Sequence, residues 1–128
     1  DFEILPILTG SMHEYIEGVK DIQDDTLSKL TDNLQKVLIE YGKPYVIIAG
    51  ADLAHIGAQF GDSFALDPFT LTRSKIGDEE ILSFIKETDA RSFFDCIKGE
   101  RDSRRICGLT PIYFLLRLVR GCTAEIKL

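Results

Sequence analysis

A strand-like apolar run that ends abruptly in polar residues constrains the fold of this chain more than any other feature. Residues 45–49 are apolar and partly β-branched, and Pro44 and Gly50 bound them. Such a run is typical of a central parallel strand covered on both faces, although a buried helix could have the same composition. Ligands of open α/β sheets bind beyond the carboxyl ends of the strands. Asp52 and His55 follow this run directly and are therefore candidate site residues.

Other segments extend this pattern to an α/β fold, with a mostly parallel sheet and flanking helices. Residues 2–10 are apolar, of strand length and closed by glycine, and residues 122–128 alternate apolar and polar side chains. Between the first two expected strands, residues 24–41 show the spacing of an amphipathic helix, so the three segments would form one βαβ unit. The apolar face of this helix, which we expect to be core, consists of Leu27, Leu30, Leu34, Val37, Leu38 and Tyr41.

The second half of the chain contains helix-start signals. Asp78 is expected to cap one short helix and Asp89 another, whereas residues 67–73 are interpreted as an irregular connection. Thr110 followed by Pro111 predicts a further helix start, with the threonine as N-cap and the proline at the first helical position.

Composition narrows the class of protein. A chain of 128 residues fits a single domain, 1–128, and its net charge of -6 argues against nucleic acid or an anionic membrane as the main partner. The 3 cysteines form no C-x-x-C pair, so neither a disulfide framework nor a zinc ribbon is indicated. With no apolar run of about 18 residues and no signal-like start, we expect a cytoplasmic protein. The chain begins without a methionine, which suggests that it is cut from a longer one.

Cys107 is the cysteine with the most reactive surroundings. It lies just before the expected helix start, and Arg104 and Arg105 precede it, a setting that favours thiolate over thiol. The alternative is a small buried hydrophobic residue. Cys96 and Cys122 have no such neighbours and are interpreted as structural.

His55 has an acidic neighbour three residues earlier in the chain. Asp52 could orient its imidazole, or the ring could simply be satisfied by a backbone carbonyl in a loop. Together with Cys107, His55 would give only two metal ligands, fewer than the three protein ligands usual in catalytic sites. A Cys–His nucleophilic pair is the other arrangement these residues allow, and no local signature supports it.

Two sequence motifs, in their order along the chain, resemble those of a known protein family. Residues 51–57 with Phe60-Gly61-Asp62 contain Asp-x-x-His-x-Gly, and residues 105–112 contain Ile-Cys-Gly-x-x-Pro-Ile. Both motifs, together with the opening residues 4–8, resemble the Memo-like proteins, known in bacteria and archaea as AmmeMemoRadiSam system protein B. The resemblance covers nearly all of the chain.

The resemblance implies a fold related to the class III extradiol ring-cleaving dioxygenases, in which a histidine in a similar position is the acid/base. It also implies a pocket of a carboxylate, histidines and one cysteine that binds iron or copper in the complete protein. Carried over to this chain, His55 and Asp52 are the catalytic residues, as proton shuttle and orienter, and Cys107 is the metal ligand, with His55 as a further ligand. Two more histidines would come from an absent amino-terminal half, so we expect the chain to be a carboxy-terminal half with weak metal binding or no activity.

Two functional hypotheses follow from the resemblance. The first is a metal-dependent, dioxygenase-like oxidoreductase. The second is a non-catalytic module that binds a peptide or partner, with a radical-SAM enzyme and an AMMECR1-type protein as the implied partners. A half-protein with a cut sheet would expose apolar surface, so homodimer formation is also expected.

Overall fold

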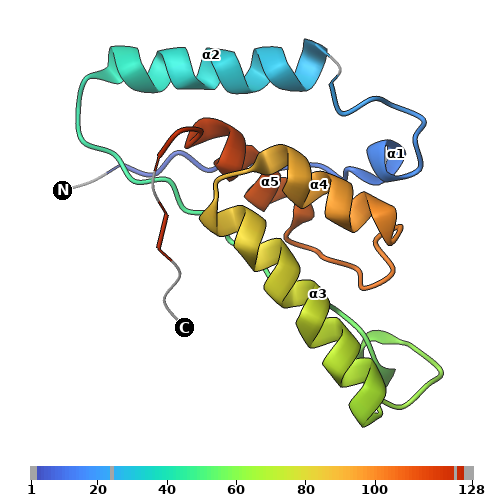
Figure 1. Ribbon diagram of the computed structural model, residues 1–128. Coiled ribbons are helices and arrows are strands. Elements are labelled where there is room, and N and C mark those ends of the chain that lie inside the picture. The colour runs from blue at the N-terminus through green and yellow to red at the C-terminus, as the bar shows by residue number, and fades with distance from the viewer. Residues whose placement is uncertain (1–2, 24, 123, 126–128) are drawn as a thin grey trace.

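The computed structural model describes residues 3–23, 25–122 and 124–125, which form a helical structure (Figure 1). Its elements are α1 (His13–Ile16), α2 (Asp25–Tyr41), the 3-10 turn η1 (Ala58–Phe60), α3 (Pro68–Lys86), α4 (Ala90–Gly99) and α5 (Leu109–Leu118). None of the described residues is in a β-strand. The predicted α/β fold with a mostly parallel sheet is therefore wrong, and so is the expected likeness to a dioxygenase-type sheet.

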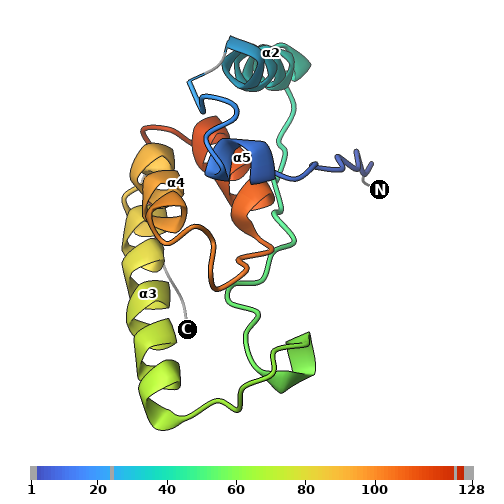
Figure 2. The ribbon, with the colours of Figure 1, turned by 90° about the vertical axis from the view of Figure 1, so that its right-hand side faces the viewer.

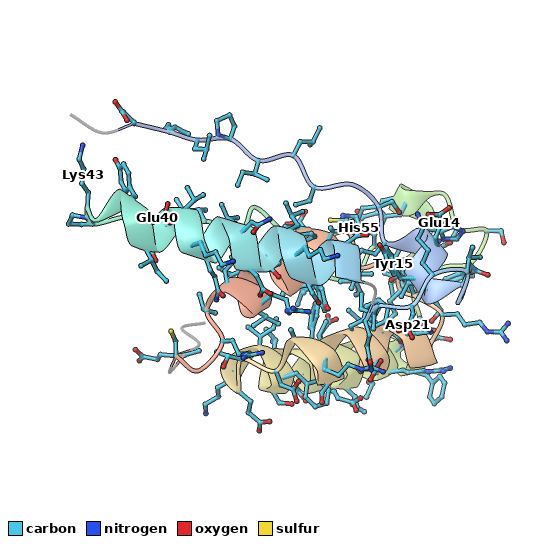
Figure 3. The ribbon with its side chains drawn as sticks, turned by 90° about the horizontal axis from the view of Figure 1, so that it is seen from above. Glu14, Tyr15, Asp21, Glu40, Lys43 and His55 are labelled. Carbon is cyan, nitrogen blue, oxygen red and sulfur yellow. The ribbon has the colours of Figure 1, made fainter. Side chains whose placement is uncertain are left out.

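The apolar runs that predicted strands lack a partner. A strand needs a neighbour to pair with its backbone N–H and C=O groups, and residues 45–49 have none among the described residues. Val46 and Ile48 are 84% and 85% exposed instead of buried. The described part of the opening segment, 3–10, is also irregular, with Leu8 fully exposed, and Figure 3 shows it running past α2. The last expected strand lies mostly outside the described residues.

The core lies where α3, α4 and α5 meet, with α1 and the residues before α2 added at one side. Phe93, Phe94 and Ile97 of α4 are fully buried against Ile81 of α3. The ring of Phe94 meets the ring of Tyr113 from α5 edge to face, with centroids 5.9 Å apart. In both ribbon views α3 extends well beyond α4 and α5 at its amino-terminal end (Figures 1 and 2).

Helix α2 confirms the predicted helix, and its packed face agrees only in part with the predicted one, since Leu27 packs against the core. Thr31 is its buried centre, at 2% exposure, and its hydroxyl donates to the backbone oxygens of Leu27 and Ser28. Leu30 and Val37, which were expected in the core, are 54% and 57% exposed. The apolar stripe fails as a guide here because α2 contacts little besides α5, so polar residues share its interface.

The helix starts after residue 60 were predicted in part. Asp89 caps α4 as expected, its Oδ1 accepting from the backbone N–H of Ser92 at 3.0 Å. Residues 67–73, interpreted as irregular, begin α3 instead, because Asp67 caps a helix with Pro68 at its first position. Asp78 therefore lies inside α3 and caps nothing. None of the helices among the described residues is long and apolar enough to cross a membrane.

Helix α5 begins two residues earlier than the sequence predicted. Gly108 is its N-cap and Leu109 its first residue, so Thr110 and Pro111 lie within the first turn. Proline is tolerated there because the first N–H groups of a helix have no intrahelical partner. The start of α5 is fixed by the contacts that Gly108 makes with another segment of the chain, at Asp52.

Candidate functional site

Two segments about fifty residues apart meet at the start of α5 and form the candidate site. The backbone N–H of His55 donates to the carbonyl oxygen of Arg104 at 2.8 Å, and the N–H of Gly108 donates to that of Asp52 at 2.9 Å. These two hydrogen bonds attach the loop after residues 45–49 to the loop before α5. They bring the two motifs of the sequence side by side.

Gly108 allows this close approach because it has no side chain. A Cβ at this position would lie 2.4 Å from the carbonyl oxygen of Asp52 and 2.8 Å from the Cβ of Ala51. Both distances are far below van der Waals contact, and neither atom belongs to a flexible side chain. The glycine of the Ile-Cys-Gly motif therefore sets the distance between Cys107 and the other segment.

The side chains of Asp52, His55 and Cys107 form a cluster at this junction. One candidate ligand atom from each residue lies within 4.8 Å of those of the other two. His55 Nε2 is 3.8 Å from Asp52 Oδ2, and Cys107 Sγ is 3.8 Å from the backbone oxygen of Asp52. The interpretation of Cys107 as a buried hydrophobic residue is wrong, because its side chain is exposed.

The hydrogen bond of the His55 ring fixes its tautomer. Nδ1 lies 2.9 Å from the carbonyl oxygen of Leu53, which can only accept, so Nδ1 carries the proton of the neutral ring. The Nε2 lone pair is therefore free on the side of Asp52 and Cys107. Phe60 from η1 meets the ring edge to face at 4.6 Å. The backbone carbonyl and Phe60, rather than Asp52, hold the imidazole in place, since 3.8 Å is too long for a hydrogen bond.

Arg105 and Asp62 support the site in a way that the sequence did not predict. Arg105 Nε donates to the carbonyl oxygen of His55 at 2.8 Å, and its two terminal nitrogens donate to Asp62 Oδ1 and Oδ2 at 2.8 and 2.7 Å. Asp62 Oδ2 also accepts from the N–H of Gly57 at 2.7 Å. The hydrogen bonds from Arg105, followed by the one from Gly57, lower the pKa of the Asp62 carboxyl. This clamp closes the loop that carries His55.

The arginines before Cys107 have other partners than its sulfur. Arg104 is 7% exposed and turns into the space between α3 and α4, where it pairs with Glu100 and Asp78. Gly77 of α3 leaves room for it, because a Cβ there would lie 2.6 Å from the guanidinium carbon. The guanidinium groups at 104 and 105 thus bind carboxylates, and the proposed help of Arg104 to a Cys107 thiolate is wrong.

The other cysteines and the second histidine lie outside the cluster. Cys96 is half-buried, and burial raises the pKa of its thiol, whereas Cys122 is exposed near the carboxyl end. His13, at the start of α1, lines a cavity of about 340 Å³ that also reaches Cys107. It is not among the three clustered residues.

The comparison with known families agrees with these motifs. A family model described as Memo-like protein matches residues 1–128. The chain belongs to the Memo-like family. Searches of curated proteins and of solved structures found no significant match. In this Memo-like chain, the two segments that carry the motifs are the ones joined by the backbone hydrogen bonds of Asp52 and His55.

Proposed function

We propose that Asp52, His55 and Cys107 bind a transition metal, as the share that this chain contributes to a dioxygenase-like oxidoreductase centre. The observation that carries the proposal is the orientation of His55. Its Nδ1 proton is held by the Leu53 carbonyl, so the Nε2 lone pair faces the other two side chains. A backbone acceptor on one ring nitrogen is the usual arrangement for a histidine that binds metal through the other.

The donor set suits this type of metal. Imidazole nitrogen, thiolate sulfur and carboxylate oxygen together favour iron, copper or zinc over calcium and magnesium, which take oxygen ligands. With bonds of about 2.0 to 2.3 Å, ligand atoms around one metal lie roughly 3 to 4 Å apart. The cluster atoms, within 4.8 Å of one another, are near this separation, and the exposed Asp52 and Cys107 side chains are free to rotate toward a metal.

Three protein ligands would leave positions open on the metal for a substrate. A bound iron or copper would supply redox and Lewis-acid chemistry. Cys107 must lose its proton to act as a ligand.

Titration with Co²⁺ tests the site, since a cobalt–thiolate bond gives a charge-transfer absorption in the near ultraviolet. Cys107→Ser should abolish this absorption, and His55→Ala should weaken Co²⁺ binding at least about tenfold. The chain provides matched controls in its exposed Cys122 and in His13, and Cys122→Ser and His13→Ala should bind as the unmodified chain does. Equal loss in Cys107→Ser and Cys122→Ser would show that the metal has no specific site here.

A second candidate function is supported by the exposed apolar segments. Ile4, Leu5 and Leu8 are 77%, 76% and 100% exposed, and Val46 and Ile48 of another segment are similarly open. Surfaces of this kind are typical of a module that binds a partner. In a protein of the AmmeMemoRadiSam type, the partner would be a radical-SAM enzyme or an AMMECR1-type protein, and a second copy of the chain is the alternative.

Association measurements separate the two functions. Binding of a purified radical-SAM or AMMECR1-type protein that survives Cys107→Ser but is lost in Leu8→Asp supports the module. Sedimentation of the chain alone shows whether the same substitution breaks up a homodimer. Cobalt binding that follows Cys107, with no association of either kind, supports the metal centre alone.

A further inference from the structure

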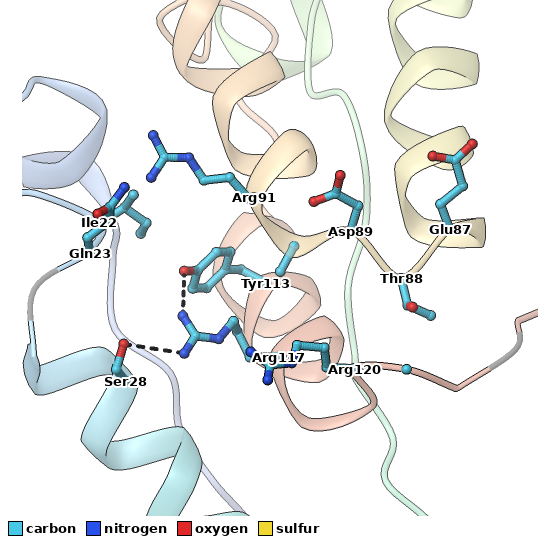
Figure 4. Close-up of a pocket in the computed structure, with 12 residues that line it drawn as sticks. Ile22, Gln23, Ser28, Glu87, Thr88, Asp89, Arg91, Tyr113, Arg117 and Arg120 are labelled. Atoms are coloured by element: carbon cyan, nitrogen blue, oxygen red, sulfur yellow. Dashed lines mark hydrogen bonds between the residues drawn. The ribbon is translucent and has the colours of Figure 1, made fainter.

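A second cavity lies between α2, α4 and α5, and none of the Asp52–His55–Cys107 cluster lines it (Figure 4). Its volume of about 730 Å³ is within the range of small-molecule sites. The cavity is lined by 3 of the chain's 7 arginines, namely Arg91 from α4, Arg117 from the last turn of α5 and Arg120 just beyond it. In a chain with a net charge of -6, so many guanidinium groups at one cavity indicate an anionic ligand.

Arg117 has donors left for such a ligand. It is half-buried and donates to the hydroxyl of Tyr113 at 3.2 Å and to that of Ser28 at 3.3 Å, both neutral acceptors (Figure 4). A guanidinium has five N–H groups, so most remain available. Among the residues that the structure describes, no carboxylate pairs with Arg117 or Arg120. The positive charge at this end of the cavity is therefore not neutralised within the described chain.

The carboxylates of the two acidic residues that line the cavity either have other hydrogen-bond partners or point away from Arg117. Both carboxylate oxygens of Asp89 accept from Ser92, from its N–H at 3.0 Å and its hydroxyl at 2.7 Å. Glu87 lies at the end of α3, and Figure 4 shows its carboxylate pointing away from Arg117. Arg91 pairs with Asp95 through Nε and keeps its terminal nitrogens for other partners.

Helix dipoles explain only part of this arrangement. Arg117 and Arg120 lie at the carboxyl end of α5, where a cation is favourable without any ligand. Arg91, however, is the second residue of α4, where the positive end of the dipole makes a cation unfavourable. Arginines from opposite helix ends thus line one cavity, on opposite sides of the Tyr113 ring (Figure 4).

We infer that this cavity binds a phosphate-type oxyanion, either free phosphate or the phosphate group of a small phosphate monoester. Guanidinium forks bind the oxygens of such groups in pairs, and the hydroxyl of Tyr113, which accepts from Arg117, can donate to the ligand at the same cavity. The volume leaves room beside the phosphate for an organic group, which would lie toward Ile22. The site is independent of the proposed metal centre.

Isothermal titration of the full chain with inorganic phosphate and with phenyl phosphate, at constant ionic strength, tests the inference. We expect saturable binding of one or both ligands, weakened at least about tenfold in Arg120→Gln and in Arg117→Gln, which is the loss expected for a charge-assisted contact. Arg73→Gln removes the same charge from an exposed position on α3 outside the cavity and should leave binding within about twofold. Circular dichroism checks that each variant folds, and the exposed Arg120 provides the test should Arg117→Gln fail to fold.

The two ligands distinguish the sources of the phosphate group. Tighter binding of phenyl phosphate indicates a monoester, and binding of inorganic phosphate alone indicates the free ion. Failure of both ligands to saturate the chain would overturn the inference, as would equal weakening by Arg73→Gln, which is the sign of diffuse attraction to positive charge. Association of Arg117 and Arg120 with an acidic protein, without phosphate binding, would overturn it too.

Discussion

Gly108→Ala is the substitution that tests most directly how the candidate site is assembled. The new methyl group would lie 2.4 Å from the carbonyl oxygen of Asp52, 2.8 Å from Ala51 Cβ and 3.0 Å from Ile112 Cδ1. The first two atoms belong to backbone or to a Cβ and cannot rotate away, so the two segments must separate. Separation stretches the hydrogen bond from the Gly108 N–H to Asp52, which is now 2.9 Å long.

The size of the effect follows from these contacts. Overpacking costs about 1 to 3 kcal/mol, and the weakened hydrogen bond adds about 1 kcal/mol. Alanine in place of glycine recovers about 0.4 to 1 kcal/mol by restricting the unfolded chain. The net expectation for Gly108→Ala is a loss of about 1 to 3 kcal/mol in the free energy of unfolding, together with weaker cobalt binding because Cys107 moves away from His55.

Urea denaturation measures the first quantity and cobalt titration the second. Gly99→Ala is the matched control, since a Cβ at Gly99, at the end of α4, meets no atom within 4 Å. It should leave stability unchanged or raise it by up to about 1 kcal/mol, with metal binding intact. The reasoning fails if Gly108→Ala is as stable as Gly99→Ala, because the close approach would then not constrain the fold.

Two further substitutions examine the groups that support the site. The lowered pKa of Asp62, due mainly to its hydrogen bonds with Arg105, means that this carboxylate stabilises the fold above its unfolded pKa and that the effect is lost as pH falls through the lower folded value. Asp62→Asn should therefore reduce the loss of stability below about pH 4 in acid titration followed by circular dichroism. Arg104→Met should lower the free energy of unfolding by about 3 kcal/mol, because it leaves two carboxylates without their partner, and the exposed Arg73→Met should stay within about 0.5 kcal/mol. An Arg104→Met chain as stable as Arg73→Met would show that the buried pairing contributes nothing net.

Local signals in the sequence predicted α2, α4 and α5 but missed the start of α3. Asp89 identified the start of α4 because an N-cap depends on residues only three positions apart. The same signal was present at Asp67 with Pro68, but the mixed composition of residues 67–73 concealed it. Asp78 is a cap candidate by type, yet its carboxylate binds Arg104, a partner that no local pattern indicates.

The strand predictions failed because they depend on a distant partner. An apolar run such as residues 45–49 states that burial would be favourable, but it does not say what would cover it. In the structure the backbone beyond this run bonds with residues 104 and 108, and Tyr45, Val46 and Ile48 of the run stay exposed. The composition of this run thus indicated a tendency to form a β-strand, whereas a β-strand needs a second strand with which its backbone can pair.

In the candidate site, too, the sequence predicted which residues take part but not how they are arranged. The sequence singled out Asp52, His55 and Cys107 through their chemistry and their motifs, and the structure places their side chains within 4.8 Å. The sequence left open that a backbone carbonyl holds the His55 ring, and the structure identifies the carbonyl as that of Leu53. Because a backbone carbonyl fixes the tautomer, substitution of Asp52 should leave Nε2 free, and His55→Ala should affect metal binding more than Asp52→Asn does. Comparison of the two variants by cobalt titration tests whether Asp52 orients the imidazole, as the sequence suggested, or contributes only its own carboxylate oxygen to the metal.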